Sequence, residues 1–177
     1  MSEQGSKVSL VAAAGYINLR GNPHSNDFLN AVESAIGQPL PVTANTISEG
    51  EYRAYWLGPD EWLLITPAGK TADVIARLDE ELAGMHAGIN DISGGNIGMH
   101  LSGENIRDVF AKGCTLDFHP QVFKVGDCAQ SGLAKANVVF GLIEEGATFE
   151  LIVRRSFADY LLQWLRQAGR EYEVEFV

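Results

Sequence analysis

Residues Tyr16-Ile17-Asn18-Leu19-Arg20-Gly21 carry a pattern that returns in the second half of the chain as Ile97-Gly98-Met99-His100-Leu101-Ser102-Gly103. In both stretches Ile, Leu or Met occupies every second position and a glycine ends the run, which is typical of a β-strand with one buried face. The two stretches lie roughly 80 residues apart, and a repeat of this kind indicates two copies of one supersecondary unit.

Each half continues with a hairpin and an amphipathic helix. In the first half Trp62-Leu63-Leu64-Ile65 precedes a helix expected at 71–83, and in the second half Phe149-Glu150-Leu151-Ile152 precedes a helix expected at 156–168. Apolar residues follow helical spacing along one face of that last helix. Both halves therefore predict the order strand, helix, hairpin, helix, and each half is expected to bury its apolar face against the other.

Periodicity and the residues that interrupt it predict the other elements. A helix whose apolar stripe runs from Phe28 to Ile36 has Ser25 or Asn26 as its expected N-cap and ends at Gly37, and a shorter helix covers 104–112. Residues 40–50 and 120–127 are expected to be loops. The expected strands are 16–20, 52–57, 61–66, 96–101, 128–134, 137–143, 147–153 and 171–176.

This order of elements predicts an α+β fold with mostly antiparallel sheets. We expect an N-terminal segment at 1–14, then a single domain at 15–177 that contains pseudo-repeats at about 15–84 and 89–169 and a C-terminal strand at 171–176. Strand 171–176 alternates Glu with apolar residues, which indicates one solvated face. The side chains expected in the core are Phe28, Val32, Trp62, Leu64, Leu78, Val109, Leu151, Leu161 and Trp164.

The composition limits the classes of partner. The chain has 177 residues, of which 46% are hydrophobic, and a formal net charge of −10. Nucleic acids and anionic membranes are bound by clustered Lys and Arg, so the charge argues against both. The acidic residues are spread along the chain, which favours a solvated acidic surface, and a basic protein partner is the alternative.

The sequence also indicates the compartment. Cys114 and Cys128 form no C-x-x-C pair, so we expect two free thiols in a reducing environment. Residues 7–14 faintly resemble a signal peptide, but their apolar core is too short and Glu3 offsets the leading charge. No apolar run approaches the ~18 residues that a membrane span needs. We therefore expect a cytoplasmic protein.

Two stretches suggest small-molecule sites, and each has a simpler interpretation. Trp62, in Leu57-Gly58-Pro59-Asp60-Glu61-Trp62-Leu63-Leu64-Ile65, either lines a ligand site or, as we favour, anchors a tight hairpin in the core. The glycine-rich Asp91-Ile92-Ser93-Gly94-Gly95-Asn96-Ile97-Gly98 leads into a strand and lacks the G-x-G-x-x-G spacing. A turn is therefore favoured over a nucleotide-binding loop.

The reactive side chains form no recognisable catalytic set. Cys114 lies in Lys112-Gly113-Cys114-Thr115-Leu116-Asp117-Phe118-His119, where a nucleophilic thiol would need an adjacent base, and a packed thiol is favoured. Arg154-Arg155 either bind an anion before the last helix or, as we favour, pair with Glu144 or Glu145. The histidines without metal-site spacing are His24, His86, His100 and His119. We therefore predict no catalytic, cofactor-binding or metal-ligating residue.

Several stretches together resemble the gamma subunit of heterotetrameric sarcosine oxidase, from about Gly15 to the C-terminus. Thr115 departs from this resemblance, because we expect proline there. The stretches are Gly21-Asn22-Pro23, Ala44-Asn45-Thr46, Trp56-Leu57-Gly58-Pro59-Asp60-Glu61-Trp62-Leu63-Leu64, Lys112-Gly113-Cys114-Thr115-Leu116-Asp117-Phe118-His119-Pro120, Cys128-Ala129-Gln130 and Arg155-Ser156-Phe157-Ala158.

The resemblance implies a bacterial cytoplasmic complex that demethylates sarcosine oxidatively to glycine and passes the one-carbon unit to tetrahydrofolate. It implies FAD, FMN, NAD and tetrahydrofolate on the larger alpha and beta subunits, zinc on the small delta subunit, and no cofactor on this chain. It also implies a fold similar to the folate-binding domain of glycine-cleavage aminomethyltransferase, and no chemistry of the gamma subunit's own.

Two hypotheses follow. The first is a non-catalytic gamma subunit that supports assembly with alpha, beta and delta subunits. The second is a stand-alone folate-dependent one-carbon (aminomethyl) transferase, although such an enzyme carries a further domain for which this chain has no room. The apolar Val8, Leu10 and Val11 lie outside both repeats and are the candidate contacts with a partner subunit.

Overall fold

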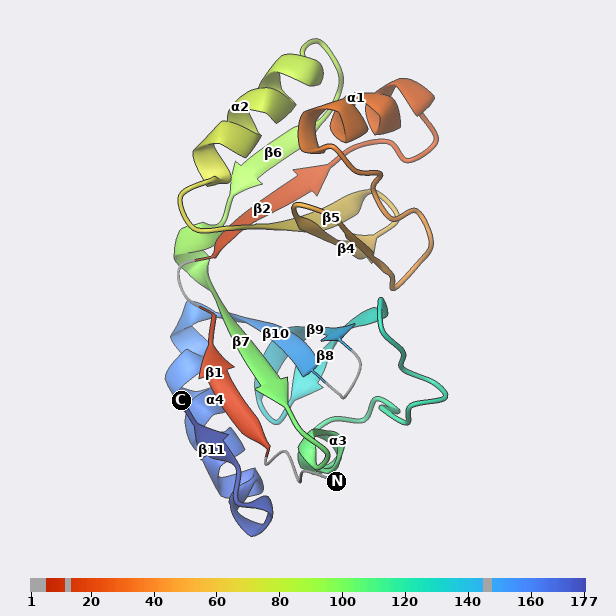
Figure 1. The fold of residues 1–177 in the computed structure, drawn as a ribbon. Coiled ribbons are helices and arrows are strands. Elements are labelled where there is room, and N and C mark those ends of the chain that lie inside the picture. The colour runs from red at the N-terminus through yellow and green to blue at the C-terminus, as the bar shows by residue number, and fades with distance from the viewer. Residues whose placement is uncertain (1–5, 12–13, 145–147) are drawn as a thin grey trace. The chain divides into compact units, whose positions relative to one another are not determined.

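The computed structural model describes residues 6–11, 14–144 and 148–177. It divides into two compact units: an N-terminal unit, Ala12–Gly94, and a C-terminal unit, which joins Met1–Val11 to Gly95–Val177. In the described residues each unit has a mostly antiparallel sheet and two α-helices, and Figure 1 shows their arrangement within each unit. The expected α+β class with mostly antiparallel sheets is confirmed.

The N-terminal unit has a five-stranded sheet in the order β3-β4-β5-β2-β6. Every neighbouring pair is antiparallel. Its helices α1 and α2 lie on one face of that sheet (Figure 1). The elements are β2 (Gly15–Arg20), α1 (Asn26–Ile36), β3 (Ile47–Glu49), β4 (Arg53–Gly58), β5 (Glu61–Thr66), α2 (Thr71–Glu81) and β6 (Gly88–Asp91).

Alternation along β2 and β5 places the core of this unit. Ile17 pairs with Leu64 and Leu19 pairs with Trp62, and all four side chains are buried beneath the helices. Helix α1 begins where Ser25 Oγ accepts a hydrogen bond from the Phe28 N–H, so Ser25 is the N-cap. The helix ends at Gly37, whose φ of 72° is left-handed and favours glycine.

The C-terminal unit has a six-stranded sheet in the order β11-β1-β7-β10-β9-β8. Its pairs are antiparallel except β1–β11, which is parallel. Short 3₁₀ turns cover Ser93–Gly95, Arg155–Phe157 and Arg170–Tyr172. The elements are β1 (Lys7–Leu10), β7 (Asn96–Ser102), α3 (Ile106–Ala111), β8 (Cys128–Leu133), β9 (Ala136–Glu144), β10 (Thr148–Arg154), α4 (Ala158–Ala168) and β11 (Glu175–Phe176).

Phenylalanine dominates the core of the C-terminal unit. Phe110, Phe118, Phe123, Phe140 and Phe149 form one cluster, with ring centroids between 5.0 and 6.0 Å apart in the contacting pairs. Tilted and edge-on pairs at these distances are favourable beyond the area they bury. The cluster joins α3 to the sheet and fixes the long connection from α3 to β8.

The expected single domain with one shared core differs from the structure, which has two core clusters, one in each unit. The physical reason is that each sheet is covered by two helices of its own. The strand orders β3-β4-β5-β2-β6 and β8-β9-β10-β7-β1 follow the same path, although β1 comes from the start of the chain. Superposition of the two halves as pseudo-repeats stays a prediction.

Several boundaries need correction. Residues 7–10 of the expected N-terminal segment are strand β1, because Lys7-Val8-Ser9-Leu10 alternates polar and apolar residues and Val8 is buried. Of the expected strand 171–176, only Glu175–Phe176 pairs, because Glu173 takes a left-handed φ of 51° that interrupts it. Strands β3 and β6 lie in segments that the sequence did not predict as strands, since both are short.

Eight of the nine predicted core side chains are buried, and the exception is Trp164. Trp164 is partly exposed and packs against the edge of the C-terminal core. A Cβ atom on Gly113 would lie 2.4 Å from the Trp164 ring, so the indole can pack there only because residue 113 is a glycine.

Candidate functional site

Trp62 has a packing role in the N-terminal unit. Its side chain is fully buried, its ring centroid lies 5.7 Å from that of Phe28, and its Nε1–H donates a hydrogen bond of 2.7 Å to the Pro41 carbonyl oxygen. A buried indole whose one polar group is satisfied is a core anchor. The hairpin interpretation of Trp62 is therefore favoured over a ligand site.

A surface pocket of about 660 Å³ lies at the end of β2 in the same unit. The Arg20 guanidinium is its cationic group, but Arg20 lies 2.6 Å from a Glu61 carboxylate oxygen and 3.7 Å from one of Asp60. Both carboxylates therefore compete with an anionic ligand for this guanidinium, in solvent-exposed ion pairs that each contribute little energy. The lining residues are Arg20, Gly21, Asn22, Pro23, Asp60, His86, Ala87 and Gly88. Such an open, mixed surface can hold a small polar molecule but has no oriented acid–base pair.

The glycine-rich segment is a turn between β6 and β7. The Asp91 carboxylate accepts hydrogen bonds from the Ser93 hydroxyl at 2.6 Å and from the Ser93 backbone N–H at 2.9 Å. The hydroxyl first, and then the backbone N–H, hold the pKa of Asp91 below its usual range. The glycines lead into strand β7 rather than into a helix. A flavin or nicotinamide dinucleotide therefore does not fit this segment.

The segment from Lys112 to His119 does not assemble a cysteine–histidine pair. The Cys114 Sγ is buried and lies 3.7 Å from Ser131 Oγ. His119 Nδ1 accepts a hydrogen bond of 3.2 Å from the Gln121 N–H, and Asp117 accepts one of 2.8 Å from the His119 N–H. The imidazole and the acid therefore order their own loop, and no base in the described part of the chain is hydrogen-bonded to the Cys114 thiol as a nucleophile would need.

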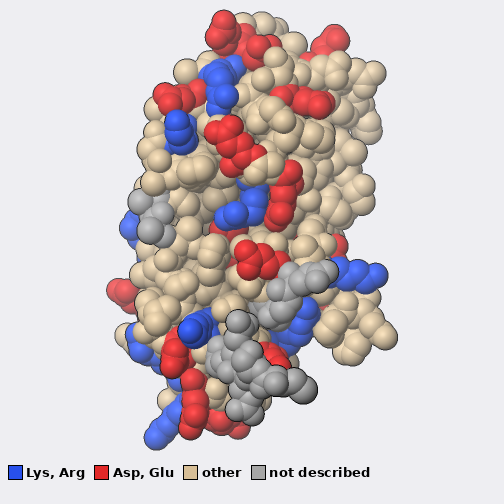
Figure 2. Space-filling view, viewed as in Figure 1, with Lys and Arg blue, Asp and Glu red and all other residues tan. Residues whose placement is uncertain are grey.

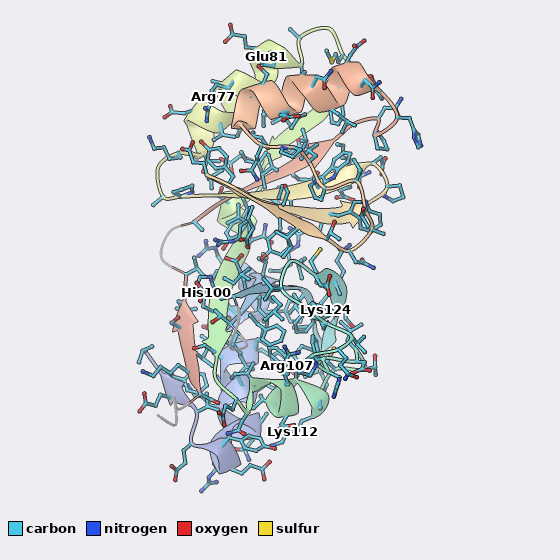
Figure 3. All side chains as sticks on the ribbon, turned by 45° about the vertical axis from the view of Figure 1, so that its right-hand side comes forward. Arg77, Glu81, His100, Arg107, Lys112 and Lys124 are labelled. Carbon is cyan, nitrogen blue, oxygen red and sulfur yellow. The ribbon has the colours of Figure 1, made fainter. Side chains whose placement is uncertain are left out.

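An acid–imidazole contact that the sequence analysis missed joins β7 to β10. His100 and Glu150 are partners in register, and His100 Nε2 lies 3.2 Å from Glu150 Oε1 (Figure 3 labels His100). Glu150 is fully buried. The signal that could have found it is a single acid inside the apolar run from Phe149 to Val153. Among the described residues, no group of three or more His, Cys, Asp and Glu side chains is arranged to hold a metal ion.

Arg155, just before α4, has a local partner. Arg155 Nη2 donates a hydrogen bond of 3.4 Å to the Asn96 carbonyl oxygen. Of the two glutamates expected to pair with Arg154 or Arg155, Glu145 lies outside the described residues. The Arg155 contact favours a structural role over an anion site.

Arg107 on α3 is a second feature that the sequence analysis missed (Figure 3). Its guanidinium donates a hydrogen bond to the Phe118 carbonyl oxygen and lies 5.1 Å from the centroid of the Phe149 ring. Burial lowers the pKa of this guanidinium. Arg107 therefore fastens the start of the connection between α3 and β8 to the phenylalanine cluster.

The three candidate interface residues differ in exposure. Leu10 is 53% exposed, whereas Val8 is 2% exposed and packs in the core of the C-terminal unit. Val11 is half-buried, and its N–H donates a hydrogen bond of 2.9 Å to the Gly98 carbonyl oxygen. Val8 is therefore corrected from a partner contact to a core residue, because its strand is part of the sheet.

The surface view of Figure 2 shows acidic and basic side chains interspersed on this face. Such a mixed face offers no extended basic patch to a polyanion. None of the helices within the described ranges has the length and apolar character to cross a membrane.

Comparison with known proteins decides the family. The model of the sarcosine oxidase, gamma subunit family matches residues 20–171. The chain belongs to this family. It is 31% identical to sarcosine oxidase subunit gamma of Corynebacterium sp. (strain P-1), covering 93% of this chain and 80% of that protein. It is 29% identical to sarcosine oxidase subunit gamma of Arthrobacter sp, covering 92% of this chain and 79% of that protein. The resemblance found in the sequence is confirmed.

Solved structures agree with this family at the level of the fold. One is a chain of heterotetrameric sarcosine oxidase from Corynebacterium sp. U-96, in complex with pyrrole 2-carboxylate, with a TM-score of 0.88 and 26% sequence identity. The match covers 97% of this chain and 87% of that chain. Glycine cleavage system aminomethyltransferase T from Bartonella henselae has a TM-score of 0.72 at 16% identity, which shows a shared fold alone. This chain spans about half of that transferase, at 48%.

Proposed function

We propose that this chain is the non-catalytic gamma subunit of a heterotetrameric sarcosine oxidase and that it supports assembly of the complex. In this proposal the complex demethylates sarcosine oxidatively to glycine and transfers the one-carbon unit to tetrahydrofolate. The partners are alpha, beta and delta subunits, and the complex works in the cytoplasm.

One observation carries the proposal. Similarity to a chain of a heterotetrameric sarcosine oxidase extends over 97% of this chain, in sequence and in fold together. Family members in two bacterial genera are subunits by name and match more than nine-tenths of this chain. A gamma-subunit role accounts for both findings.

The cofactors are assigned to the partner subunits. We assign FAD, FMN, NAD and tetrahydrofolate to the alpha and beta subunits and zinc to the delta subunit. Three reactive side chains of this chain support that division, because each bonds to another part of the same unit: Cys114 to Ser131, His119 to Gln121 and Arg155 to Asn96. Their polar atoms serve the fold rather than a cofactor.

The second candidate is a folate-dependent aminomethyltransferase activity in this chain alone. The fold shared with aminomethyltransferase T and the pocket beside Arg20 and Asp60 favour it. Against it, the Arg20 guanidinium is already engaged by two carboxylates, which leaves the pocket without a free cation for the glutamate tail of a folate.

Separate and joint expression distinguishes the two candidates. The purified chain alone should neither oxidise sarcosine nor retain tetrahydrofolate, and co-expression with the other subunits of its host should yield an active complex that contains it. An Arg20→Ala variant serves as the control for the pocket. Loss of folate binding by that variant, with binding by the unaltered chain, would establish the transferase candidate instead.

A further inference from the structure

We propose that residues 119–126, here called the valine loop, dock on a partner subunit that presents an apolar recess with a carboxylate at its rim. This inference rests on the proposed function and names the surface that the gamma subunit uses. The valine loop is His119-Pro120-Gln121-Val122-Phe123-Lys124-Val125-Gly126, in the connection between α3 and β8. In Figure 1 this connection runs along the β8 edge of the C-terminal unit.

Buried phenylalanines hold the valine loop in place. Phe118 precedes it and Phe123 lies within it, and their ring centroids are 5.3 Å apart. The two rings also lie 5.8 and 6.0 Å from the Phe149 ring in the core. Because Arg107 also bonds the Phe118 carbonyl oxygen, the start of the loop is fastened from two sides.

The backbone of the valine loop is ordered by its own hydrogen bonds. The N–H groups of Val122 and Phe123 donate to the His119 carbonyl oxygen at 2.8 and 2.9 Å. The Gly126 N–H donates to the Leu142 carbonyl oxygen at 2.9 Å, and Gly126 has a left-handed φ of 87°. A loop that is ordered before binding loses little conformational entropy when it docks.

The valine loop presents apolar side chains to solvent. Val122 is 58% exposed and Val125 is 47% exposed, while Phe123 between them is buried. The described surface has one other pair of exposed large apolar residues within four positions, Phe157 and Tyr160, and the Tyr160 hydroxyl already accepts a hydrogen bond from the Lys135 N–H. The two valines have aliphatic side chains without a polar group, and they lie on one ordered loop. Clustered apolar exposure of this kind marks a protein-binding surface.

Charge indicates the chemistry of the partner. The valine loop contains Lys124 and no acidic residue, although the whole chain has 23 acidic and 13 basic residues. The flanking carboxylates of Asp117 and Asp127 accept hydrogen bonds from backbone N–H groups of the loop. Among the described residues, none forms an ion pair with the Lys124 ammonium, which Figure 3 labels. A carboxylate on the partner would complement it.

The test is co-expression of variants with the alpha, beta and delta subunits of the same host. Val122→Asp/Val125→Asp removes the apolar patch, and Lys124→Glu reverses the charge. The matched controls are Val42→Asp, which alters an exposed valine of the N-terminal unit, and Lys135→Glu, which alters an exposed lysine in the β8–β9 turn. Native mass spectrometry measures how much of each variant the complex retains, and thermal melting of each isolated chain reports its folding.

We expect Val122→Asp/Val125→Asp to lower retention at least tenfold, Lys124→Glu to lower it several-fold, and both controls to assemble normally. Hydrogen exchange of the unaltered chain adds a measurement without substitution: amides of the valine loop should exchange more slowly in the complex than in the isolated chain. Normal assembly of both loop variants, or unchanged exchange in the valine loop, would overturn this inference alone. Failure of the unaltered chain to join any complex would overturn the proposed function.

Discussion

At the scale of single residues, Trp62 is the side chain on which the N-terminal core depends most. Its indole fills the space between β5 and α1, and its Nε1–H satisfies the buried Pro41 carbonyl oxygen. Trp62→Phe removes that donor and part of the ring, so we expect a loss of about 2–3 kcal/mol in the free energy of unfolding. Trp62→Ala should cost about 3–5 kcal/mol.

Urea denaturation measures both variants. Trp164→Phe is the matched control, because Trp164 is partly exposed and packs at the edge of a core. That change should cost less than about 1 kcal/mol. Equal losses for Trp62→Phe and Trp164→Phe would contradict the role given to the indole hydrogen bond.

Arg107 should also contribute to the stability of the C-terminal unit. Arg107→Met keeps the aliphatic stem but removes the bond to the Phe118 carbonyl oxygen and the charge over the Phe149 ring. We expect a loss of about 1.5–3 kcal/mol, since a charged donor is removed from a partly buried carbonyl. Arg166→Met, which removes an exposed guanidinium 4.1 Å from the Phe176 ring, is the control and should cost below about 1 kcal/mol. Chemical denaturation measures both variants. A larger loss in the free energy of unfolding for Arg166→Met than for Arg107→Met would refute the structural role of Arg107.

At the scale of elements, the turn after β6 should respond to pH. The folded-state pKa of Asp91 is lowered by Ser93, so the stabilisation is present above the unfolded pKa of about 3.9 and is lost as the pH falls through the folded pKa. NMR titration should place the Asp91 pKa below that value, and Ser93→Ala should raise it. Ser156→Ala alters an exposed serine elsewhere and should leave the pKa unchanged. An Asp91 pKa insensitive to Ser93→Ala would rule out these hydrogen bonds as the cause.

Strand β1 is the element that joins the N-terminal segment to the C-terminal unit. It lies between β11 and β7 and contributes Val8 to the core. Deletion of residues 1–10 should therefore destabilise the C-terminal unit by at least ~3 kcal/mol, because a buried side chain and two rows of strand hydrogen bonds are lost. Circular dichroism melting checks this. Since such a deletion confuses folding with binding, Leu10→Asp is the sharper test of a partner contact on β1.

If Leu10 lies in an interface, Leu10→Asp should weaken assembly while the melting temperature of the isolated chain stays the same. Ser9→Asp, one position earlier on β1, is the neighbouring control. Normal retention of the Leu10 variant in the complex would remove β1 from the interface and leave the valine loop as the proposed contact.

At the scale of the whole molecule, the sequence predicted what periodicity encodes. Local patterns predicted the end of α1 at Gly37, the hairpin that contains Trp62 and the apolar face of α4. Local patterns did not predict that β1 joins the C-terminal sheet, because the pairing of residues 7–10 with residues 99–102 depends on contacts between distant parts of the chain. For the same reason the Arg107–Phe118 and His100–Glu150 contacts were missed, since each joins groups that lie in different parts of the fold.

The sequence indicated two similar units, but it did not indicate that each unit has a core of its own. A repeat predicts that two units are alike, but it does not predict whether they share a core. In each unit the helices pack on the sheet of that unit and form a separate core with it. The lack of a catalytic motif in the sequence directed attention to surfaces. The valine loop was not predicted, because it needs Phe123 buried and Val122 exposed, and two adjacent apolar letters do not reveal which of them is buried.

Reconstitution of the complex tests whether this chain acts as a subunit. The alpha, beta and delta subunits of the host would be expressed with and without this chain, and native mass spectrometry and sarcosine oxidation would be measured on each preparation and on the chain alone. We predict one complex that contains this chain and oxidises sarcosine, an inactive isolated chain, and impaired assembly without it. An equally abundant and active complex without this chain, or sarcosine oxidation by this chain alone, would contradict the account.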